Sequence, residues 1–313
     1  MGFFDTILTP LYYFVSGIMV GWHWVFEHLG LPADSGWTWL LTIIGLTITI
    51  RAMLIPLFVK QIKSSRNMQL LQPQVKELQK KYGHDRERLA QEQMKLFKET
   101  GTNPLASCMP LLLQMPIFFA LFRVIDHAAN GEARGVLSDA QAASIQDATF
   151  AGAQIADRFI DGDVSIKIIT ATMVVIMCAT TFLTQRQLMS KNMPASAMTG
   201  QYAQTQKLML YVLPFVFAIG GVAFPIGVLM YWVTSNLWTM GQQFYVIRNN
   251  PAPGTPAAEA KAKRDEAKGK GPATVTSESS SSGGNTETKA VTPKRQQPRN
   301  QSRKNRKSGG GKK

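Results

Sequence analysis

Arg51 is the residue whose chemistry stands out, because it interrupts an apolar stretch that is otherwise free of charge. The stretch runs from Trp39 to Val59 and is long enough to cross a bilayer, which takes about 20 mostly apolar residues. A cation near the middle of such a span costs roughly 2.5–3.5 kcal/mol. The sequence therefore predicts that the fold gives Arg51 water or an anion, and Arg51 is the first candidate for function.

Polar side chains in this and other apolar segments could share a site with Arg51. Thr47 lies four residues earlier, on the same helix face. The further polar candidates are Gln114, Gln185, Ser235 and Asn236. Each of these alone is more typical of an interhelical hydrogen bond than of a substrate contact. For Arg51 the alternative is snorkelling to the nearer interface, but helical side chains lean toward the N-terminus, which here points away from that interface. We therefore favour a hydrated groove.

The other reactive residue types form no catalytic or metal-binding pattern. The four histidines have no ligand spacing, and both cysteines fall in apolar segments, as small buried hydrophobic residues do. No Ser/His or Asp/Asp pair falls at span depth, as an intramembrane protease would need. We predict no metal, no cofactor and no enzymatic activity. A secondary transporter is the rival class, although the sequence contains no clear inverted repeat.

Apolar runs and the distribution of Lys and Arg predict an all-α polytopic membrane protein with five spans. Residues 1–50 contain no Lys or Arg, whereas residues 60–103 contain ten. Because cytoplasmic loops are enriched in these residues, the N-terminus is expected outside and the C-terminus in the cytoplasm. The predicted spans are 38–59, 104–127, 166–184, 208–223 and 226–247, joined by an extracytoplasmic loop at 128–165 and a cytoplasmic loop at 185–207.

Two further segments flank or join these spans. Residues 1–37 are expected outside, with an interfacial helix in preference to a sixth span, because their Trp and Tyr suit the headgroup zone. Residues 60–103 are charged and prone to form helices, which predicts a cytoplasmic helical hairpin. It is either a solvated connector or, as its length favours, a docking element. Its candidate contact residues are Lys76, Lys80, Lys81, Arg86 and Arg88.

The C-terminal segment 248–313 contains almost no large apolar side chains and is predicted to be a disordered basic tail. It contributes much of the net charge of +14. A basic tail attracts anionic lipid or RNA, and these alternatives stay open. The candidate residues are Arg303, Lys304, Arg306 and Lys307.

Several motifs, in order, resemble the YidC-type membrane protein insertases. They begin at residues 50, 68, 96, 113 and 231 and read IRAMLIPL, MQLLQPQV, LFKETGTNPL, LQMPIF and YWVTSNL. The resemblance covers roughly residues 3–250 and corresponds to a short form without the large extracytoplasmic domain of some members. No cysteine precedes Cys108, so the lipoprotein N-terminus of other members is not expected.

The resemblance implies five spans around a hydrophilic groove that is open to the cytoplasm and to lipid. The family's groove arginine corresponds to Arg51, and its groove-lining positions correspond to Thr47, Gln185 and Trp232. The implied function is insertion and folding of nascent integral membrane proteins in the bacterial cytoplasmic membrane, with the client's apolar segment sliding along the lipid-facing side of the first, second and fifth spans. Implied partners are the ribosome through rRNA, the Sec translocase, the signal-recognition targeting machinery and anionic lipid.

Overall fold

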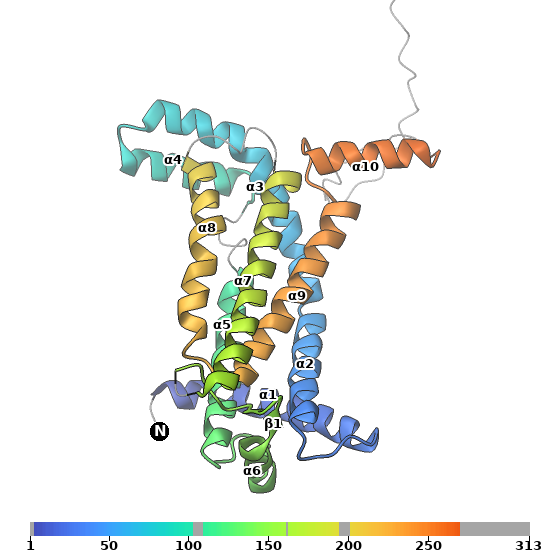
Figure 1. Cartoon of the computed structure of the whole chain (residues 1–313). Helices are drawn as coiled ribbons and strands as arrows, with labels where there is room; N and C mark the ends of the chain where they lie inside the picture. The colour runs from blue at the N-terminus through green and yellow to red at the C-terminus, as the bar shows by residue number, and fades with distance from the viewer. Residues whose placement is uncertain (1–2, 103–108, 161, 194–200, 270–313) are drawn as a thin grey trace, which may run out of the picture. The chain divides into compact units, whose positions relative to one another are not determined.

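The computed structural model describes residues 3–102, 109–160, 162–193 and 201–269, and these residues are mostly helical (Figure 1). Its elements, in chain order, are α1 (Phe3–His28), α2 (Gly36–Met53), α3 (Ile55–Tyr82), α4 (Arg86–Glu99), α5 (Met109–Ala129), α6 (Asp139–Asp147), β1 (Thr149–Phe150), β2 (Ala153–Gln154), α7 (Val164–Asn192), α8 (Gln201–Gly221), α9 (Ile226–Asn249) and α10 (Pro256–Ala267).

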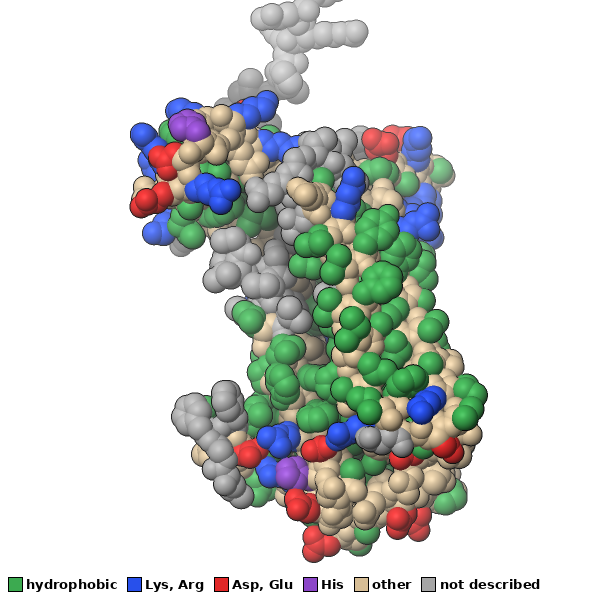
Figure 2. All heavy atoms as spheres, turned by 60° about the vertical axis from the view of Figure 1, so that its left-hand side comes forward, with side chains coloured by type: hydrophobic (Ala, Val, Ile, Leu, Met, Phe, Trp, Pro, Cys, Tyr) green, Lys and Arg blue, Asp and Glu red, His purple; other side chains and the backbone are tan. Residues whose placement is uncertain are grey.

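Within the described part of the chain, three helices are long and apolar enough to cross a membrane. They are α2, the Leu112–Ala129 part of α5, and α7. A shorter apolar stretch, Gln206–Gly221, lies in α8. Helix α7 has 29 residues and is therefore about 43 Å long, which exceeds a hydrocarbon core of about 30 Å. Figure 2 shows the matching surface, an apolar band between two ends where charged side chains gather.

The first predicted span is not one continuous helix. Helix α2 ends at Met53, Leu54 lies between the helices, and α3 begins with Pro56 in its first turn. Proline has no backbone N–H to continue the α2 hydrogen-bond ladder, which accounts for the break. The chain then runs without a further break to Tyr82, so α3 forms both the end of the predicted span and the first arm of the predicted hairpin.

Within the segment predicted to form a helical hairpin, α3 and α4 pack against each other. Asp85 caps α4, because its carboxylate accepts a hydrogen bond of 3.0 Å from the backbone N–H of Arg88.

Helices α1 and α6 and a short hairpin of β1 and β2 lie at the end of the protein that carries the predicted extracytoplasmic segments (Figure 1). The two strands are antiparallel, with Phe150 opposite Ala153, and the two turn residues Ala151 and Gly152 both have positive φ. Such a turn matches the twist of a tight hairpin. Helix α1 is anchored to α2 where Trp22 donates a hydrogen bond of 2.9 Å to Thr49.

The apolar core lies where α2, α5 and α9 meet and pack against α1. Leu46, Leu121 and Val228 are fully buried there. Gly227 permits this approach: a Cβ at this position would lie 3.2 Å from Ile125 Cδ1 of α5 and 3.2 Å from Ile43 Cδ1 of α2. A second cluster, around Met177 and Leu229, joins α7 to α9.

Several predicted boundaries differ from the structure. Residues 185–192 continue α7, and residues 201–207 begin α8, although 185–207 had been predicted as a loop. No helix breaker occurs before Pro194 in the sequence, so polar residues can extend α7 beyond its apolar part. The predicted loop 128–165 contains α6 and the β1–β2 hairpin.

The prediction that the whole segment 248–313 is disordered is wrong for α10. Thr255 caps this helix, accepting a hydrogen bond of 3.3 Å from the N–H of Ala258, and Pro256 occupies its first turn. The small residue Ala257 is buried, so α10 packs without a large apolar side chain. The lack of large apolar side chains therefore did not indicate disorder in this part of the segment.

Candidate functional site

Arg51 lies in the last turn of α2, directly before the break at Leu54. Its residue surface is 9% exposed, so the cation is almost fully buried. The final turn of a helix carries a partial negative charge, and a cation there is stabilised by about 0.3–1 kcal/mol. The helix break thus offsets part of the cost of placing a charge at this depth.

The guanidinium of Arg51 is bound to Ser235 of α9. Nε donates a hydrogen bond of 3.1 Å to Ser235 Oγ, and Nη2 donates to the same oxygen. The ring of Phe58, from α3, lies 5.7 Å from the guanidinium carbon, within cation–π range. Across the described residues, no carboxylate lies within ion-pair distance of Arg51. Its positive charge is therefore held by neutral groups.

Tyr231 extends this polar centre and was missed in the sequence analysis. Its hydroxyl accepts a hydrogen bond from the Gln114 side chain of α5, and it lies near enough to Arg51 to interact with it electrostatically. Tyr231 precedes Ser235 by one helical turn, which places both on one face of α9. That spacing was the signal that could have identified it. Three helices, α2, α5 and α9, therefore contribute to the centre.

The other predicted groove residues do not join this centre directly. Thr47 is buried, and its hydroxyl donates a hydrogen bond of 2.7 Å to Ile43 O in its own helix. Asn236 donates one of 3.1 Å to Thr181 of α7, and Gln185 is half-buried on α7. Trp232 packs in an aromatic cluster, with ring centroids 4.8 Å from Phe217, 5.3 Å from Phe118 and 5.8 Å from Phe224.

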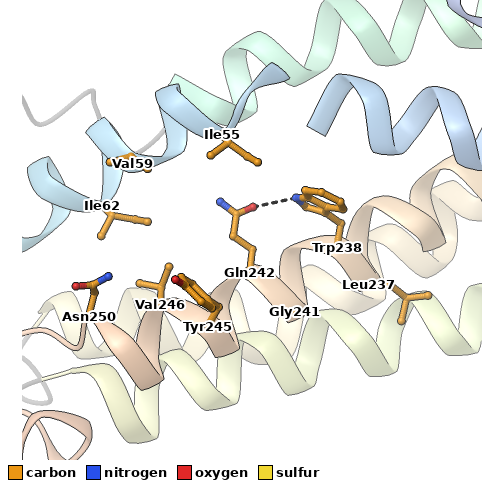
Figure 3. A pocket seen from close by; sticks show the side chains of 10 residues that line it. All are labelled: Ile55, Val59, Ile62, Leu237, Trp238, Gly241, Gln242, Tyr245, Val246 and Asn250. Carbon is orange, nitrogen blue, oxygen red and sulfur yellow. Dashed lines mark hydrogen bonds between the residues drawn. The ribbon is translucent and has the colours of Figure 1, made fainter. Parts of the chain in front are cut away.

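An apolar cavity of about 570 Å³ lies between α3 and α9 (Figure 3). Two of its lining residues are close in sequence to the pair Arg51 and Ser235. Ile55 follows Arg51 by four residues, and Leu237 follows Ser235 by two. The indole of Trp238 donates a hydrogen bond of 3.1 Å to Gln242, which satisfies two polar groups at the wall. The lining residues are Ile55, Val59, Ile62, Leu237, Trp238, Gly241, Gln242, Tyr245, Val246 and Asn250.

The predicted docking residues lie on the α3–α4 hairpin. Lys80, Lys81, Arg86 and Arg88 are exposed, and Lys76 is half-buried. The ring of Tyr82 lies 5.2 Å from Lys81 Nζ and 5.3 Å from the Arg88 guanidinium carbon. The four candidate residues of the tail, Arg303, Lys304, Arg306 and Lys307, lie outside the described residues.

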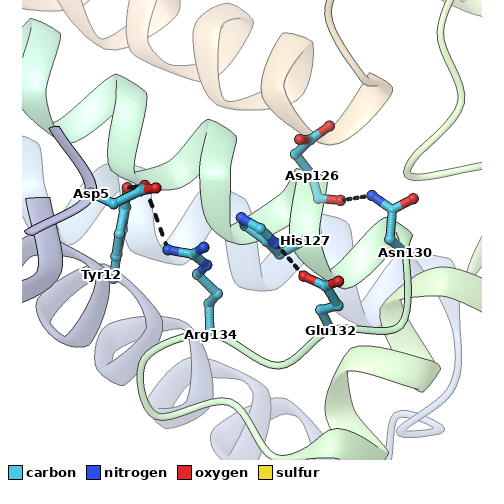
Figure 4. A network of polar contacts seen from close by, with 7 residues as sticks. All are labelled: Asp5, Tyr12, Asp126, His127, Asn130, Glu132 and Arg134. Carbon is cyan, nitrogen blue, oxygen red and sulfur yellow. Dashed lines mark hydrogen bonds and ion pairs between the residues drawn. The ribbon is translucent and has the colours of Figure 1, made fainter. Parts of the chain in front are cut away.

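The opposite end of the protein holds a polar network that ties α1 to the segment after α5 (Figure 4). Arg134 pairs with Asp5 at 3.6 Å, and the Tyr12 hydroxyl donates a hydrogen bond of 2.9 Å to Asp5. Burial, together with this hydrogen bond, raises the pKa of Tyr12. Two further contacts fix the same segment, those of His127 with Glu132 and of Arg158 with Asp126. Polar contacts therefore hold α1, α5 and the segment after α5 together at this end.

Apolar helices of membrane-crossing length, with a buried cation between them, define a multi-pass integral membrane protein. The family model of the 60Kd inner membrane proteins matches residues 31–253. The membrane protein insertase YidC of Streptomyces avermitilis is 48% identical over 260 residues, covering 80% of this chain and 60% of that protein. The YidC of Tropheryma whipplei strain Twist is 35% identical over 84% of this chain and 90% of that protein. The chain belongs to the YidC-type family of membrane protein insertases.

A crystal structure of an active YidC insertase is also similar. It is 26% identical, covers 78% of this chain and 47% of that chain, and gives a TM-score of 0.47. The chain spans 60% of the length of the Streptomyces relative. Because its relatives are named as insertases, the prediction of a family that is not enzymatic is confirmed, as is the predicted family itself.

Proposed function

We propose that this protein inserts integral membrane proteins into the bacterial cytoplasmic membrane and assists their folding. Its family membership and the names of its relatives support this function. The observation that carries the proposal is the position of Arg51, a buried cation whose only described hydrogen-bond partner is the neutral Ser235. Such a centre can accept a polar or acidic segment that is crossing the membrane.

A client carboxylate is expected to replace Ser235 at the guanidinium. A charge-assisted hydrogen bond is roughly twice as strong as a neutral one, so the exchange favours an anionic client segment. A guanidinium has five N–H donors, so the client can also bind while Ser235 keeps its contact. In this mechanism Thr47, Gln114, Gln185, Trp232 and Asn236 border the client's path.

The apolar segment of the client is expected to use the cavity between α3 and α9 and the lipid-facing surfaces of α7 and α8. Val175 of α7 and Phe215 and Ile219 of α8 are 65%, 71% and 75% exposed, as expected of side chains that face lipid. Burial of the client's apolar surface drives the step, at roughly 25 cal/mol per Å². No external energy source is then required.

Reconstituted liposomes with a labelled single-span client test this proposal through protease protection. Two matched clients differ only in an acidic or neutral translocated segment. Arg51→Ala is expected to reduce insertion of the acidic client about fivefold, equivalent to about 1 kcal/mol of lost attraction, and to leave the neutral client less affected. Arg51→Lys, which keeps the charge, is the control. Equal insertion of the acidic client by the wild-type protein and Arg51→Ala would refute the electrostatic step.

The same liposomes separate the insertase from its rival class. A secondary transporter would also place a charge at mid-membrane, and it would take up solute without inserting the client. Protection of the client fragment in the absence of solute uptake supports the insertase.

We further propose five membrane spans, with α8 and α9 added to the three long apolar helices, and α1 lying at the outer interface. In this topology the N-terminus lies outside, and the hairpin and C-terminus lie in the cytoplasm. Support comes from the Lys and Arg distribution. Single cysteines placed on the α3–α4 hairpin and in the segment 128–165 should react with an impermeant thiol reagent that is added to opposite sides of the membrane.

The hairpin and the tail are proposed docking elements. Exposed cations on α3 and α4 suit a partner such as the Sec translocase or the signal-recognition targeting machinery. The basic tail suits ribosomal RNA or anionic lipid. Salt-sensitive ribosome co-sedimentation that is lost on truncation after residue 269, which keeps α10, would favour RNA.

A further inference from the structure

A second cavity lies where α7, α9 and α10 meet, and neither the family resemblance nor the proposed insertion step accounts for it. Its volume is about 330 Å³, comparable to about eleven water molecules at the liquid volume of about 30 Å³ each. Its lining residues are Gln187, Lys191, Phe244, Ile247, Arg248, Pro256, Ala257, Ala260 and Arg264.

The charges that line this cavity are all positive. Lys191, Arg248 and Arg264 contribute one cation from each of the three helices. The acidic residues of α10, Glu259, Asp265 and Glu266, are not among the lining residues. Three cations converging on one small space suit a phosphate, which offers several strong acceptor oxygens.

Two hydrogen bonds fix the relative positions of α7, α9 and α10 at this cavity, where Lys191 and Arg248 are exposed and Arg264 is half-buried. Arg264 Nη2 donates a hydrogen bond of 2.7 Å to Arg248 O, which positions the guanidinium at the end of α9. Asn192 Oδ1 accepts a hydrogen bond of 2.8 Å from the N–H of Ala252, which ties the chain before α10 to the end of α7. A guanidinium has five donors, so the bond to Arg248 leaves several for a ligand.

An apolar path leads from the cavity toward the membrane-spanning parts of α7 and α9. Phe244 and Ile247 form one side of the cavity, and Phe244 is 54% exposed. On α7, Leu183 lies one turn before Gln187, on the same face, and is 44% exposed. A ligand with a phosphate at one end and a hydrocarbon chain at the other would match both parts.

The depth of the cavity also matches a lipid headgroup. Lys191 and Arg248 lie in the last turns of α7 and α9, just beyond their apolar parts. Basic pockets between the ends of transmembrane helices on the cytoplasmic side are known to hold anionic lipid headgroups. RNA is less suited, because a nucleic-acid strand binds along open basic grooves with stacking aromatics, whereas this space is small and lies between three helices.

We propose that the cavity formed by α7, α9 and α10 binds the phosphate headgroup of an anionic phospholipid, whose acyl chain lies along Phe244 and Leu183. In the proposed topology the lipid belongs to the cytoplasmic leaflet. By joining α10 to the ends of two spans, the bound lipid would hold the beginning of the C-terminal segment at the membrane surface.

The test uses the full chain in nanodiscs of phosphatidylcholine containing a minor fraction of phosphatidylglycerol, with retained lipids counted by native mass spectrometry. The wild-type protein is expected to retain phosphatidylglycerol preferentially. The variant K191Q/R264Q should reduce this selectivity about twenty-fivefold, since each of the two cations near the surface contributes about fivefold. The matched control K261Q/K263Q also removes two positive charges, but from residues of α10 that do not line the cavity. It should retain the preference for phosphatidylglycerol.

Three results would overturn the proposal. The first is a wild-type protein without preference for phosphatidylglycerol, and the second is an equal loss in both double variants, which would indicate diffuse attraction. The third is cavity-dependent binding of a labelled oligoribonucleotide without lipid selectivity, which would assign the cavity to RNA. Lys191→Gln alone leaves the Arg264 contact intact and should still lose about fivefold, so the test stands even where the double variant fails to fold.

Discussion

Replacement of Ser235 by alanine removes the one described hydrogen-bond acceptor of Arg51 and leaves the guanidinium buried. A hydrogen bond to a charged group contributes about 1.5–3 kcal/mol, whereas interhelical hydrogen bonds measured inside membranes average about 0.6 kcal/mol and reach about 1.7 kcal/mol. Because two N–H groups of a 9% exposed cation converge on Ser235 Oγ, we expect a coupling near the top of the membrane range, about 1.5 kcal/mol.

A double-mutant cycle isolates this coupling. It uses Ser235→Ala, Arg51→Met and the combined variant, with the free energy of unfolding measured in bicelles by steric trapping. Ser235→Ala should destabilise the wild-type protein much more than it destabilises Arg51→Met, in which no buried cation is left without an acceptor. The control is Thr180→Ala, because among the described residues the Thr180 hydroxyl donates hydrogen bonds to carbonyl groups of its own helix. Additive effects, with a coupling below about 0.3 kcal/mol, would refute the reasoning.

Two further predictions concern packing and the attachment of α10. Gly45→Ala would place a Cβ 2.6 Å from the Trp22 ring and should cost about 1–3 kcal/mol, whereas Gly21→Ala, which meets open space, should be neutral or stabilising by up to about 1 kcal/mol. Thermal unfolding in detergent measures both, and equal destabilisation would contradict the packing argument. Asn192→Ala leaves the buried N–H of Ala252 without its acceptor, at a cost of about 1–3 kcal/mol. Hydrogen exchange should accelerate in α10 while the α2 core stays protected, and unchanged exchange in α10 would contradict this.

The sequence was sufficient for the helical class and the family. It also predicted Arg51 as the first candidate for function, because a lone charge in an apolar run carries a large energetic cost. It also contained Ser235, although as one of several polar candidates. Which of them contacts Arg51 depends on the rotation of α9 relative to α2, and that rotation is set by packing across the whole interface. Local periodicity does not specify it.

The misses have equally physical causes. The break at Leu54 was not anticipated because the apolar run continues past it to Val59, whereas Pro56 lies in the first turn of a new helix. Helix α10 was missed because burial of small residues such as Ala252 and Ala257 leaves little trace in composition. Its dependence on Asn192 is a contact between residues sixty positions apart, which no local pattern contains.

The start of α9 depends on a segment far earlier in the chain. The N–H groups of Ile226 and Gly227 donate hydrogen bonds of 3.0 Å to Asp157 O and 2.9 Å to Ile155 O. Helix N-termini leave such groups without partners inside the helix. In the proposed topology, the segment 128–165 must therefore cross the bilayer before α9 can settle against α2. The order of synthesis meets this requirement, and the protein's own assembly would stall at its last helix whenever translocation of that earlier segment failed.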